Sequence, residues 1–261
     1  MANGFVWYEL MTSGDLDTAV AFYSKVVGWD VRDSGMPGMK YMIFGKDGKD
    51  VGGMMAWSAM GMQKPTSWKG HIYTAGVDDE VKAVVADGGK EFRPPMDIPG
   101  VGRFAVVGDP QGAEYLLFQP GQQYAPPRLG QNDLGNVGWH ELSTSDSVAA
   151  WEFYSKHYGW EKDFAMPMGE LGVYQTFRAG GEKYCGAMMN TMPEAPDKTP
   201  KWLYYFTVDS VDTAAERIKA AGGTVAFGPM DVPGGSRILQ GFDPSGGYFA
   251  LTTPQTGQAG K

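Results

Sequence analysis

The sequence repeats itself, and this repeat constrains the fold more than any other feature. Residues 5–29 read FVWYELMTSGDLDTAVAFYSKVVGW, and residues 139–160 read WHELSTSDSVAAWEFYSKHYGW. Both stretches run from a strand-like segment through an acidic break and a Phe-Tyr pair to a final Gly-Trp. Self-similarity of this kind predicts a chain of two related halves. A length of 261 residues also favours about two domains.

The repeated stretch predicts a strand followed by a helix. Side chains alternate across a strand, so Trp7, Glu9 and Met11 share one face. Apolar residues then recur every three or four positions, which is the pattern of a helix with one buried face. Asp15 is placed to cap the start of this helix, and Gly28 to take the left-handed conformation at its end.

More strands and a second helix complete the first half. The runs KYMIFG (40–45) and VGGMMAW (51–57) predict two strands. GHIYTAGV then begins a second unit, with a short helix near residues 81–85 and the later strands GRFAVVG and AEYLLFQ. The four residues from Asp109 to Gly112, DPQG, fit a type I turn between these last strands.

The second half repeats these landmarks and predicts the same architecture. PMDVPG (229–234) matches PMDIPG (95–100), DPSG (243–246) matches the DPQG turn, and a helix is expected over residues 211–221. The chain therefore contains four β-α-β-β-β units, an α+β fold. Each unit leaves one sheet face bare, and two bare faces that pair would enclose a curved cup with an apolar interior, suited to a ligand.

The pattern also predicts domain limits. Residues 121–136 carry Pro, Gly, Gln and Asn without periodicity, which is typical of a linker. We therefore expect one domain over residues 1–120, a second over 137–254, and a tail over 255–261.

Composition excludes several classes of partner. A formal net charge of −8 argues against a nucleic-acid binder and against an anionic membrane surface. The N-terminus lacks the features of a signal peptide, and no apolar run reaches the length of a membrane span. The single cysteine, Cys185, fits a reducing compartment. We expect a cytoplasmic monomer or homodimer.

These landmarks resemble the vicinal oxygen chelate superfamily, which includes glyoxalase I, bleomycin-resistance proteins, fosfomycin-resistance enzymes and extradiol dioxygenases. The resemblance rests on the ELMT run with its FY and GW pairs, the ELST counterpart, the VDD and VDS segments and both DPxG turns. The resemblance extends from about residue 5 to residue 254. Within the superfamily, the chain is similar to the tandem glyoxalase-like subgroup labelled hydroxylase or antigen. It implies glyoxalase-like folds and leaves the reaction open, because one fold hosts many chemistries.

The resemblance also implies where a metal would be held. Relatives use His, Gln and Glu side chains that face into the cup. The corresponding positions of this chain hold, in pairs from the two halves, Trp7 and Trp139, Met55 and Met189, Ile72 and Leu203, and Leu116 and Ala250, with His71 one residue out of register. None of these pairs is a good ligand for a divalent metal, so we expect no metal and no cofactor.

Two glutamates are the candidate catalytic groups. Glu9 and Glu141 lie mid-strand on the face expected inside the cup. A buried carboxylate needs a partner, and Arg103 and Arg237, at matching places in the two halves, are the candidates. Such a pair either fixes the strand register, which we favour, or leaves a glutamate with a raised pKa as general base or ligand anchor.

Aromatic residues could line a pocket for a flat ligand beside these charged groups. The candidates are Trp7, Trp139, Tyr73, Tyr204 and Phe118, although each could equally belong to the core.

The three histidines, His71, His140 and His157, are expected to be structural. His140 and Glu141 are adjacent on a strand and point to opposite faces, so they cannot chelate one ion. Cys185 lacks the basic surroundings that activate a nucleophile.

Three functions remain open. The first is a metal-independent protein that binds a hydrophobic or aromatic small molecule. The second is a lyase, isomerase or dioxygenase that recruits a metal through His71 or His140 together with Glu9 or Glu141. The third is an interaction protein whose cups are filled by their own side chains.

Overall fold

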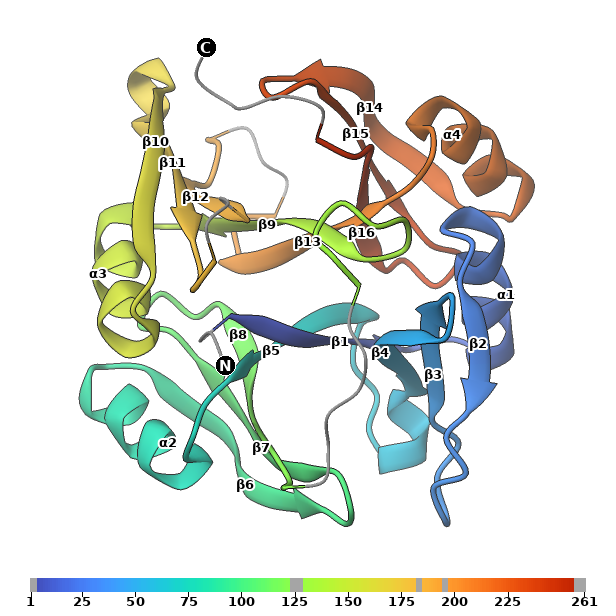
Figure 1. The fold of residues 1–261 in the computed structure, drawn as a ribbon, viewed down its shortest axis with the longest axis horizontal. Coiled ribbons are helices and arrows are strands. Elements are labelled where there is room, and N and C mark those ends of the chain that lie inside the picture. The colour runs from blue at the N-terminus through green and yellow to red at the C-terminus, as the bar shows by residue number, and fades with distance from the viewer. Residues whose placement is uncertain (1–3, 123–128, 182–184, 194–196, 256–261) are drawn as a thin grey trace. The chain divides into compact units, whose positions relative to one another are not determined.

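The computed structural model of the chain describes residues 4–122, 129–181, 185–193 and 197–255 (Figure 1). The first half contains β1 (Phe5–Thr12), α1 (Leu16–Val26), β2 (Asp30–Asp33), β3 (Met42–Lys46), β4 (Lys49–Ala56), η1 (Trp57–Met60), β5 (Ser67–Tyr73), α2 (Val77–Ala86), β6 (Lys90–Ile98), β7 (Gly102–Gly108) and β8 (Glu114–Pro120).

The second half repeats this order. It contains β9 (Val137–Thr144), α3 (Ser147–Tyr158), β10 (Glu161–Pro167), η2 (Gly169–Leu171), β11 (Val173–Arg178), β12 (Gly186–Asn190), β13 (Lys201–Thr207), α4 (Val211–Ala220), β14 (Thr224–Val232), β15 (Ser236–Phe242) and β16 (Tyr248–Thr252). We call the four β-α-β-β-β units modules 1 to 4 in chain order: β1–β4, β5–β8, β9–β12 and β13–β16.

Each half forms one eight-stranded sheet. The strand orders are β2-β3-β4-β1-β5-β8-β7-β6 and β10-β11-β12-β9-β13-β16-β15-β14. In every module the helix connects the first strand to an outer strand, and the chain returns so that the last strand pairs with the first. The predicted α+β class, with four β-α-β-β-β units paired as two sheets, is confirmed.

The predicted first helix is confirmed together with its ends. The side chain of Asp15 accepts a hydrogen bond from the backbone N–H of Thr18 at 2.8 Å, which caps α1. Gly28 follows the helix with a φ of 85°, in the region that favours glycine.

The helix expected near residues 81–85 begins earlier than its apolar pattern indicated. α2 starts at Val77, and its first turn carries Asp78, Asp79 and Glu80. Acidic side chains stabilise the positive end of the helix dipole, so this polar turn belongs to the helix although its hydrophobic pattern does not show it.

The described part of the predicted linker is packed against the sheet. The Trp29 indole donates a hydrogen bond to the Gly135 carbonyl at 2.7 Å, and the backbone N–H of Gly135 donates to Thr207 at 2.8 Å. Residues 123–128 of the linker and 256–261 of the expected tail lie outside the described residues.

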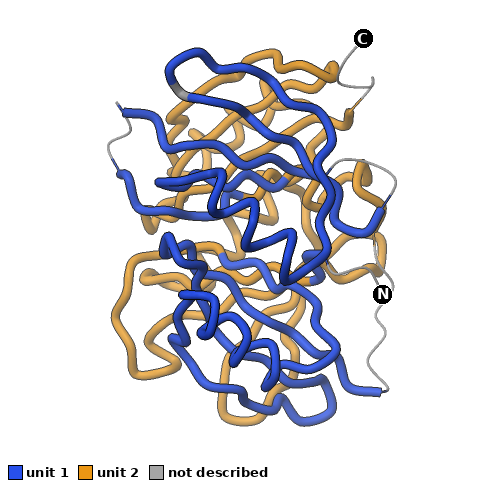
Figure 2. Tube along the Cα trace, turned by 90° about the vertical axis from the view of Figure 1, so that its left-hand side faces the viewer, with its two compact units in different colours: residues 1–6, 69–125, 140–203 blue, residues 7–68, 126–139, 204–261 orange. Residues whose placement is uncertain are grey.

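The chain divides into two compact units, and neither coincides with a sequence half (Figure 2). Unit 1 comprises residues 1–6, 69–125 and 140–203, and unit 2 comprises residues 7–68, 126–139 and 204–261. Unit 1 therefore holds modules 2 and 3, and unit 2 holds modules 1 and 4, apart from residues at the ends of four strands. The domain limits expected from the sequence stay a prediction.

Within unit 2, a buried hydrogen-bond relay joins module 1 to module 4. The Trp68 indole donates to Tyr23 Oη at 3.0 Å, and Tyr23 Oη donates to Asp243 Oδ2 at 3.0 Å. The other oxygen of Asp243 accepts the backbone N–H groups of Ser245 and Gly247, both at 2.8 Å. The helical Phe-Tyr pair of one half is thereby tied to the DPxG turn of the other.

Unit 1 contains the same relay with the halves exchanged. Trp202 donates to Tyr154 Oη at 2.9 Å, and Tyr154 donates to Asp109 Oδ2 at 3.1 Å. Burial raises the pKa of the Asp109 carboxyl above its ordinary value, because desolvation disfavours the charged form.

Aromatic rings surround both relays. In unit 2 the Trp29 ring stacks on Phe44 with centroids 4.0 Å apart. In unit 1 Trp160, the Gly-Trp counterpart of Trp29, stacks on Phe177 at 4.6 Å. The repeated Gly-Trp landmark is therefore part of the core.

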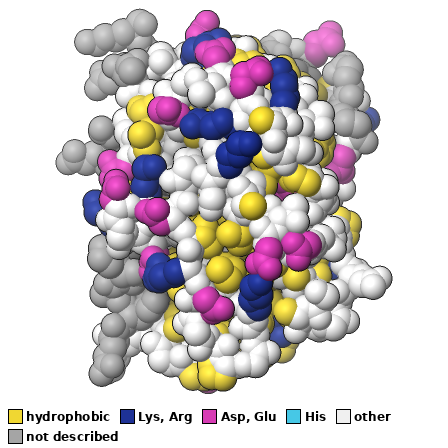
Figure 3. All heavy atoms as spheres, turned by 90° about the vertical axis from the view of Figure 1, so that its right-hand side faces the viewer, with side chains coloured by type: hydrophobic (Ala, Val, Ile, Leu, Met, Phe, Trp, Pro, Cys, Tyr) yellow, Lys and Arg dark blue, Asp and Glu magenta, His cyan; other side chains and the backbone are white. Residues whose placement is uncertain are grey.

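On the surface shown in Figure 3, basic and acidic side chains are interspersed among hydrophobic ones, so charge is not separated by sign on that face. Among the described helices, none has the length and apolar character needed to cross a membrane.

The relays yield a stability prediction. Tyr23→Phe leaves the Trp68 indole N–H and the Asp243 carboxylate each one partner short, so it should lower the free energy of unfolding by about 1–3 kcal/mol. Tyr154→Phe should act alike in unit 1. Urea unfolding measures both effects, with Tyr73→Phe as control, since that hydroxyl bonds none of the described residues. Losses no larger than the control's would contradict the structural role of the relays.

Candidate functional site

The sheet face that α1 leaves uncovered carries Trp7, Glu9 and Met11, as the alternation predicts. Tyr8 and Leu10, the intervening residues, are buried on the other face. The Trp7 indole donates to Tyr41 Oη at 3.0 Å, so the orientation of this half-buried ring is set by a hydrogen bond. A Cβ at Gly53 would collide with the Tyr41 ring and hydroxyl, which explains the glycine there.

Tyr41 of this pair also packs against a cluster of methionines around Trp57. Met11, Met55 and Trp57 are buried, and Met39, Tyr41 and Met60 pack against them while partly exposed. Met side chains are flexible and polarisable, and they line binding surfaces that adapt to their ligand. This Met-Trp face, as we call it, lies entirely in unit 2.

The glutamate expected to pair with arginine has a tyrosine partner instead. Tyr174 Oη donates to Glu141 Oε2 at 2.8 Å across β11, β12 and β9 in unit 1. Tyr41 is the equivalent of Tyr174. The residue after each tyrosine, Met42 or Gln175, lies opposite the matching methionine of the next strand, Met54 on β4 or Met188 on β12. At Glu141, a tyrosine oxygen thus takes the place where the sequence led us to expect an arginine.

Each arginine pairs with one aspartate in the first turn of its module's helix and one on the neighbouring strand. Arg103 lies 2.7 Å from Asp78 and 2.8 Å from Asp97, and Arg237 pairs with Asp212 and, at 3.2 Å, with Asp231. The predicted Glu-Arg pairing is therefore wrong. Arg103 and Arg237 project to the helix side of their sheets, since each reaches an aspartate in the first turn of α2 or α4.

The remaining aromatic candidates differ in how deeply they are buried. Trp139 and Tyr73 are half-buried, and Phe118 is 5% exposed with its ring 6.2 Å from that of His71. Tyr204 is 1% exposed and packs edge-on against Tyr8, so it belongs to the core.

One implied ligand position needs correction. Ile72 is fully buried on the helix side of β5, whereas His71 is opposite Leu116 on β8. In the second half Tyr205, and not Leu203, is opposite Ala250. His71 and Tyr205, and not Ile72 and Leu203, therefore occupy the implied ligand position of the first and second half. The distinction matters because a shift of one residue moves a side chain to the other face of the strand.

Sequence reasoning missed a polar group on module 4. Gln240 Nε2 donates to Tyr205 Oη at 2.6 Å, and Tyr248 Oη donates to Gln240 Oε1. Period-two alternation in RILQGF and YFALT could have placed Gln240 and Tyr248 on one face. Their contact with Tyr205 could be found only from the register of β13 and β15 against β16.

His140 and Cys185 are structural, as expected. His140 is buried, its Nδ1 lies 2.8 Å from the Cys185 carbonyl, and its ring stacks on Phe5 at 4.6 Å. Burial lowers the pKa of His140 to about 4. Burial raises the pKa of the Cys185 thiol to about 12, so the reactive thiolate is disfavoured.

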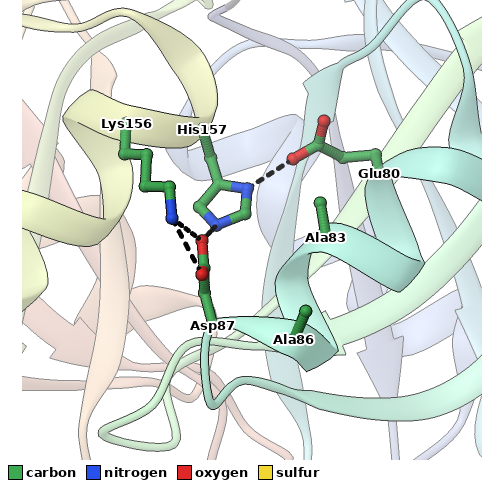
Figure 4. A pocket seen from close by; sticks show the side chains of 6 residues that line it. All are labelled: Glu80, Ala83, Ala86, Asp87, Lys156 and His157. Carbon is green, nitrogen blue, oxygen red and sulfur yellow. Dashed lines mark hydrogen bonds and ion pairs between the residues drawn. The ribbon is translucent and has the colours of Figure 1, made fainter.

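A pocket of about 380 Å³ lies between α2 and α3 in unit 1 (Figure 4). His157 stands between two carboxylates, with Nδ1 2.8 Å from Glu80 and Nε2 3.0 Å from Asp87, and Lys156 lies 2.6 Å from Asp87. Ala83 and Ala86 complete the lining. Because the Lys156 ammonium and both ring nitrogens of His157 already lie close to carboxylates inside the pocket, the group fits a link between two helices better than a ligand site.

Two tandem modules per sheet, aromatic cores and uncovered inner faces define a tandem glyoxalase-like protein, and the comparisons agree. Residues 5–115 and 136–251 both match the family model of the Glyoxalase/Bleomycin resistance protein/Dioxygenase superfamily. The chain belongs to this superfamily.

Similar proteins extend over almost the whole chain. It is 31% identical to the "Putative glyoxylase CFP32" of Mycobacterium tuberculosis, over 95% of this chain and 94% of that protein. It is 29% identical to the anthracycline biosynthesis protein DnrV of Streptomyces peucetius, over 96% of this chain and 93% of that protein.

Solved structures share the fold. A Mn(II)-bound glyoxalase from Novosphingobium aromaticivorans has a TM-score of 0.67 at 17% identity and covers 98% of this chain and 83% of its own. The dioxygenase LapB of Pseudomonas sp. KL28 has a TM-score of 0.65 at 14% identity, over 98% of this chain and 92% of its own.

The donor set does not fit the metal that such relatives bind. The implied positions offer the indole of Trp7, the thioether of Met55, and the aliphatic Leu116 beside a single imidazole, His71. Hard or borderline divalent metals need several N or O ligands at one point. Within residues 4–122, 129–181, 185–193 and 197–255 there is no group of three His, Cys, Asp or Glu side chains that could supply them.

The depressed pKa of His140 predicts a pH effect on stability. Its folded pKa of about 4 lies below the ordinary 6.5, so the unfolded chain takes up this proton first as the pH falls. The stabilisation is complete above pH 6.5 and is lost between pH 6.5 and 4, by up to about 3 kcal/mol. The free energy of unfolding of wild type and of His140→Asn should be measured across this range, and the excess stability of wild type should decrease as the pH falls. Parallel stability profiles would contradict a buried neutral imidazole.

Proposed function

We propose that the chain is a metal-independent binding protein that holds a hydrophobic, flat aromatic small molecule on the uncovered faces of its sheets. One observation carries the proposal: Trp7 stands at a position where the family resemblance implies a metal ligand, and its indole is held by Tyr41, which packs against the methionines of the Met-Trp face. An indole replaces a charged, wet centre by an apolar surface.

The chemistry of this face favours aromatic ligands. Offset or edge-on ring contacts contribute about 0.5–1.5 kcal/mol beyond area burial. Thioether sulfurs also contact ring edges favourably and adjust to the shape of a ligand. An oxyanion would gain little from Trp7, Met11 and Met55 and would lose its hydration.

The names of two relatives support a flat ligand. DnrV and DauV, both 29% identical to this chain, are named for anthracycline biosynthesis, and anthracyclines are planar aromatic compounds. The alternative, a metal-dependent lyase, isomerase or dioxygenase, has support from the names of structural neighbours that share the fold at 13–17% identity.

Trp7→Ala should weaken binding of a planar probe such as quinizarin at least about fivefold, because aromatic stacking worth about 1 kcal/mol is lost. Titration of protein fluorescence or of ligand absorption measures the dissociation constant. The control is Trp151→Ala, an indole on α3 that lies beneath the Lys162 ammonium and outside the Met-Trp face. Equal loss in both variants, or no saturable binding by wild type, would refute the proposal.

Chelation separates the two functions. After dialysis against EDTA, the affinity for quinizarin should remain within about twofold, because the implied positions lack ligands. Elemental analysis of protein purified without chelator should find well under one equivalent of Mn, Fe, Ni or Zn. Loss of binding that Mn(II) restores would favour the metal-dependent alternative.

A further inference from the structure

The sheet face that α4 leaves uncovered differs from its counterpart in the first half. In unit 2, Tyr205 and Gln240 are both opposite Ala250, and Tyr248 is opposite Phe242. Leu239, Phe249 and Leu251 are fully buried on the helix side. Because side chains alternate along each strand, the hydrogen-bonded set of Tyr205, Gln240 and Tyr248 lies on the uncovered face.

This set, which we call the Tyr-Gln-Tyr group, fixes the orientation of an amide. A glutamine amide offers two N–H donors and two acceptor lone pairs. Gln240 uses one donor on Tyr205 and one lone pair for Tyr248 within the described part of the chain. Tyr205 is 2% exposed, so packing around its ring fixes the hydroxyl that receives the Gln240 hydrogen bond. Gln240, half-buried, can present its second donor and lone pair to a ligand.

Large, partly exposed apolar side chains lie at neighbouring register positions on this face. Phe227 is opposite Gln240 and Met230 is opposite Ile238, and they are 48% and 40% exposed. Phe242, also 40% exposed, contacts the Tyr248 ring with centroids 5.0 Å apart. Contiguous exposed apolar surface with a few polar groups inside it is typical of a binding site.

The counterpart face on module 2 has a different electrical character. Leu116 is the equivalent of Ala250, so the register makes His71, Val106 and Glu114 the equivalents of Tyr205, Gln240 and Tyr248. Glu114 lies 3.3 Å from Lys69, and the Arg93 guanidinium lies over the Phe104 ring. The Tyr-Gln-Tyr group and its apolar neighbours are all uncharged.

We propose that Gln240, held by Tyr205 and Tyr248, is a specificity-determining residue, and that its face takes an uncharged planar aromatic molecule with a donor and an acceptor on its edge, such as a phenolic hydroxyl beside a ketone. This inference rests on the proposed binding function. A charged ligand would lose hydration beside the uncharged Tyr-Gln-Tyr group and its apolar neighbours. A site built to hydrogen-bond a ligand discriminates strongly against analogues that lack the polar group, because its own buried groups are then left unpaired.

The test compares three probes on the full chain. Quinizarin is a planar dihydroxyanthraquinone, anthracene has the same fused rings without polar groups, and an anthraquinone sulfonate adds a charge. Wild type should bind quinizarin at least about tenfold more tightly than either of the others. Gln240→Val, which copies the counterpart Val106, should abolish the preference over anthracene and leave the anthracene affinity within about twofold.

Two further variants complete the test. Tyr248→Phe keeps the ring and removes the hydroxyl that orients the amide, so it should reduce the preference even if Gln240→Val does not fold, as judged by circular dichroism. Gln175→Val is the matched control, because Gln175 donates its hydrogen bonds to main-chain carbonyls in unit 1.

The outcomes separate the two proposals. Saturable binding with a preference that survives both Gln240→Val and Tyr248→Phe, or with no preference in wild type, overturns the role of Gln240 and leaves the binding function standing. No saturable binding of any probe by wild type overturns both.

Discussion

The buried hydrogen bond from a helical tyrosine to a turn aspartate is the interaction on which the rest of this structure depends. Tyr23 of the first half reaches Asp243 of the second, and Tyr154 of the second reaches Asp109 of the first. Each aspartate is also held by backbone N–H groups of its own turn. A carboxylate so deeply buried would be costly without these partners. Each compact unit therefore needs both halves to complete its core.

This arrangement gives the most visible repeated motifs a structural role. The Phe-Tyr and Gly-Trp pairs and the DPxG turns all lie in the two aromatic cores, where they hold modules together. The candidate binding groups lie on the opposite sheet faces. There the two halves differ, with Val106 on one side and Gln240 on the other, because those positions carry none of the packing that the relays require.

The helices α1 and α3 also differ between the halves at one equivalent position. His157 occupies the place that Val26 has in the first half, and it is held between Glu80 and Asp87 where Val26 is fully buried in an apolar contact. A polar link and an apolar residue thus occupy equivalent positions. Both remain compatible with the fold, since they lie outside the relays and the strand registers.

The sequence by itself determined the repeat, the four modules, the α1 helix with its Asp15 cap, and the face shared by Trp7, Glu9 and Met11. These features depend on local periodicity and on residues close in the chain. Only the tertiary structure decided which aspartates pair with Arg103 and Arg237, that His71 and not Ile72 is opposite Leu116, and that Tyr205 and Tyr248 meet on Gln240. Such contacts join distant strands, and a shift of one residue in register moves every side chain to the other face.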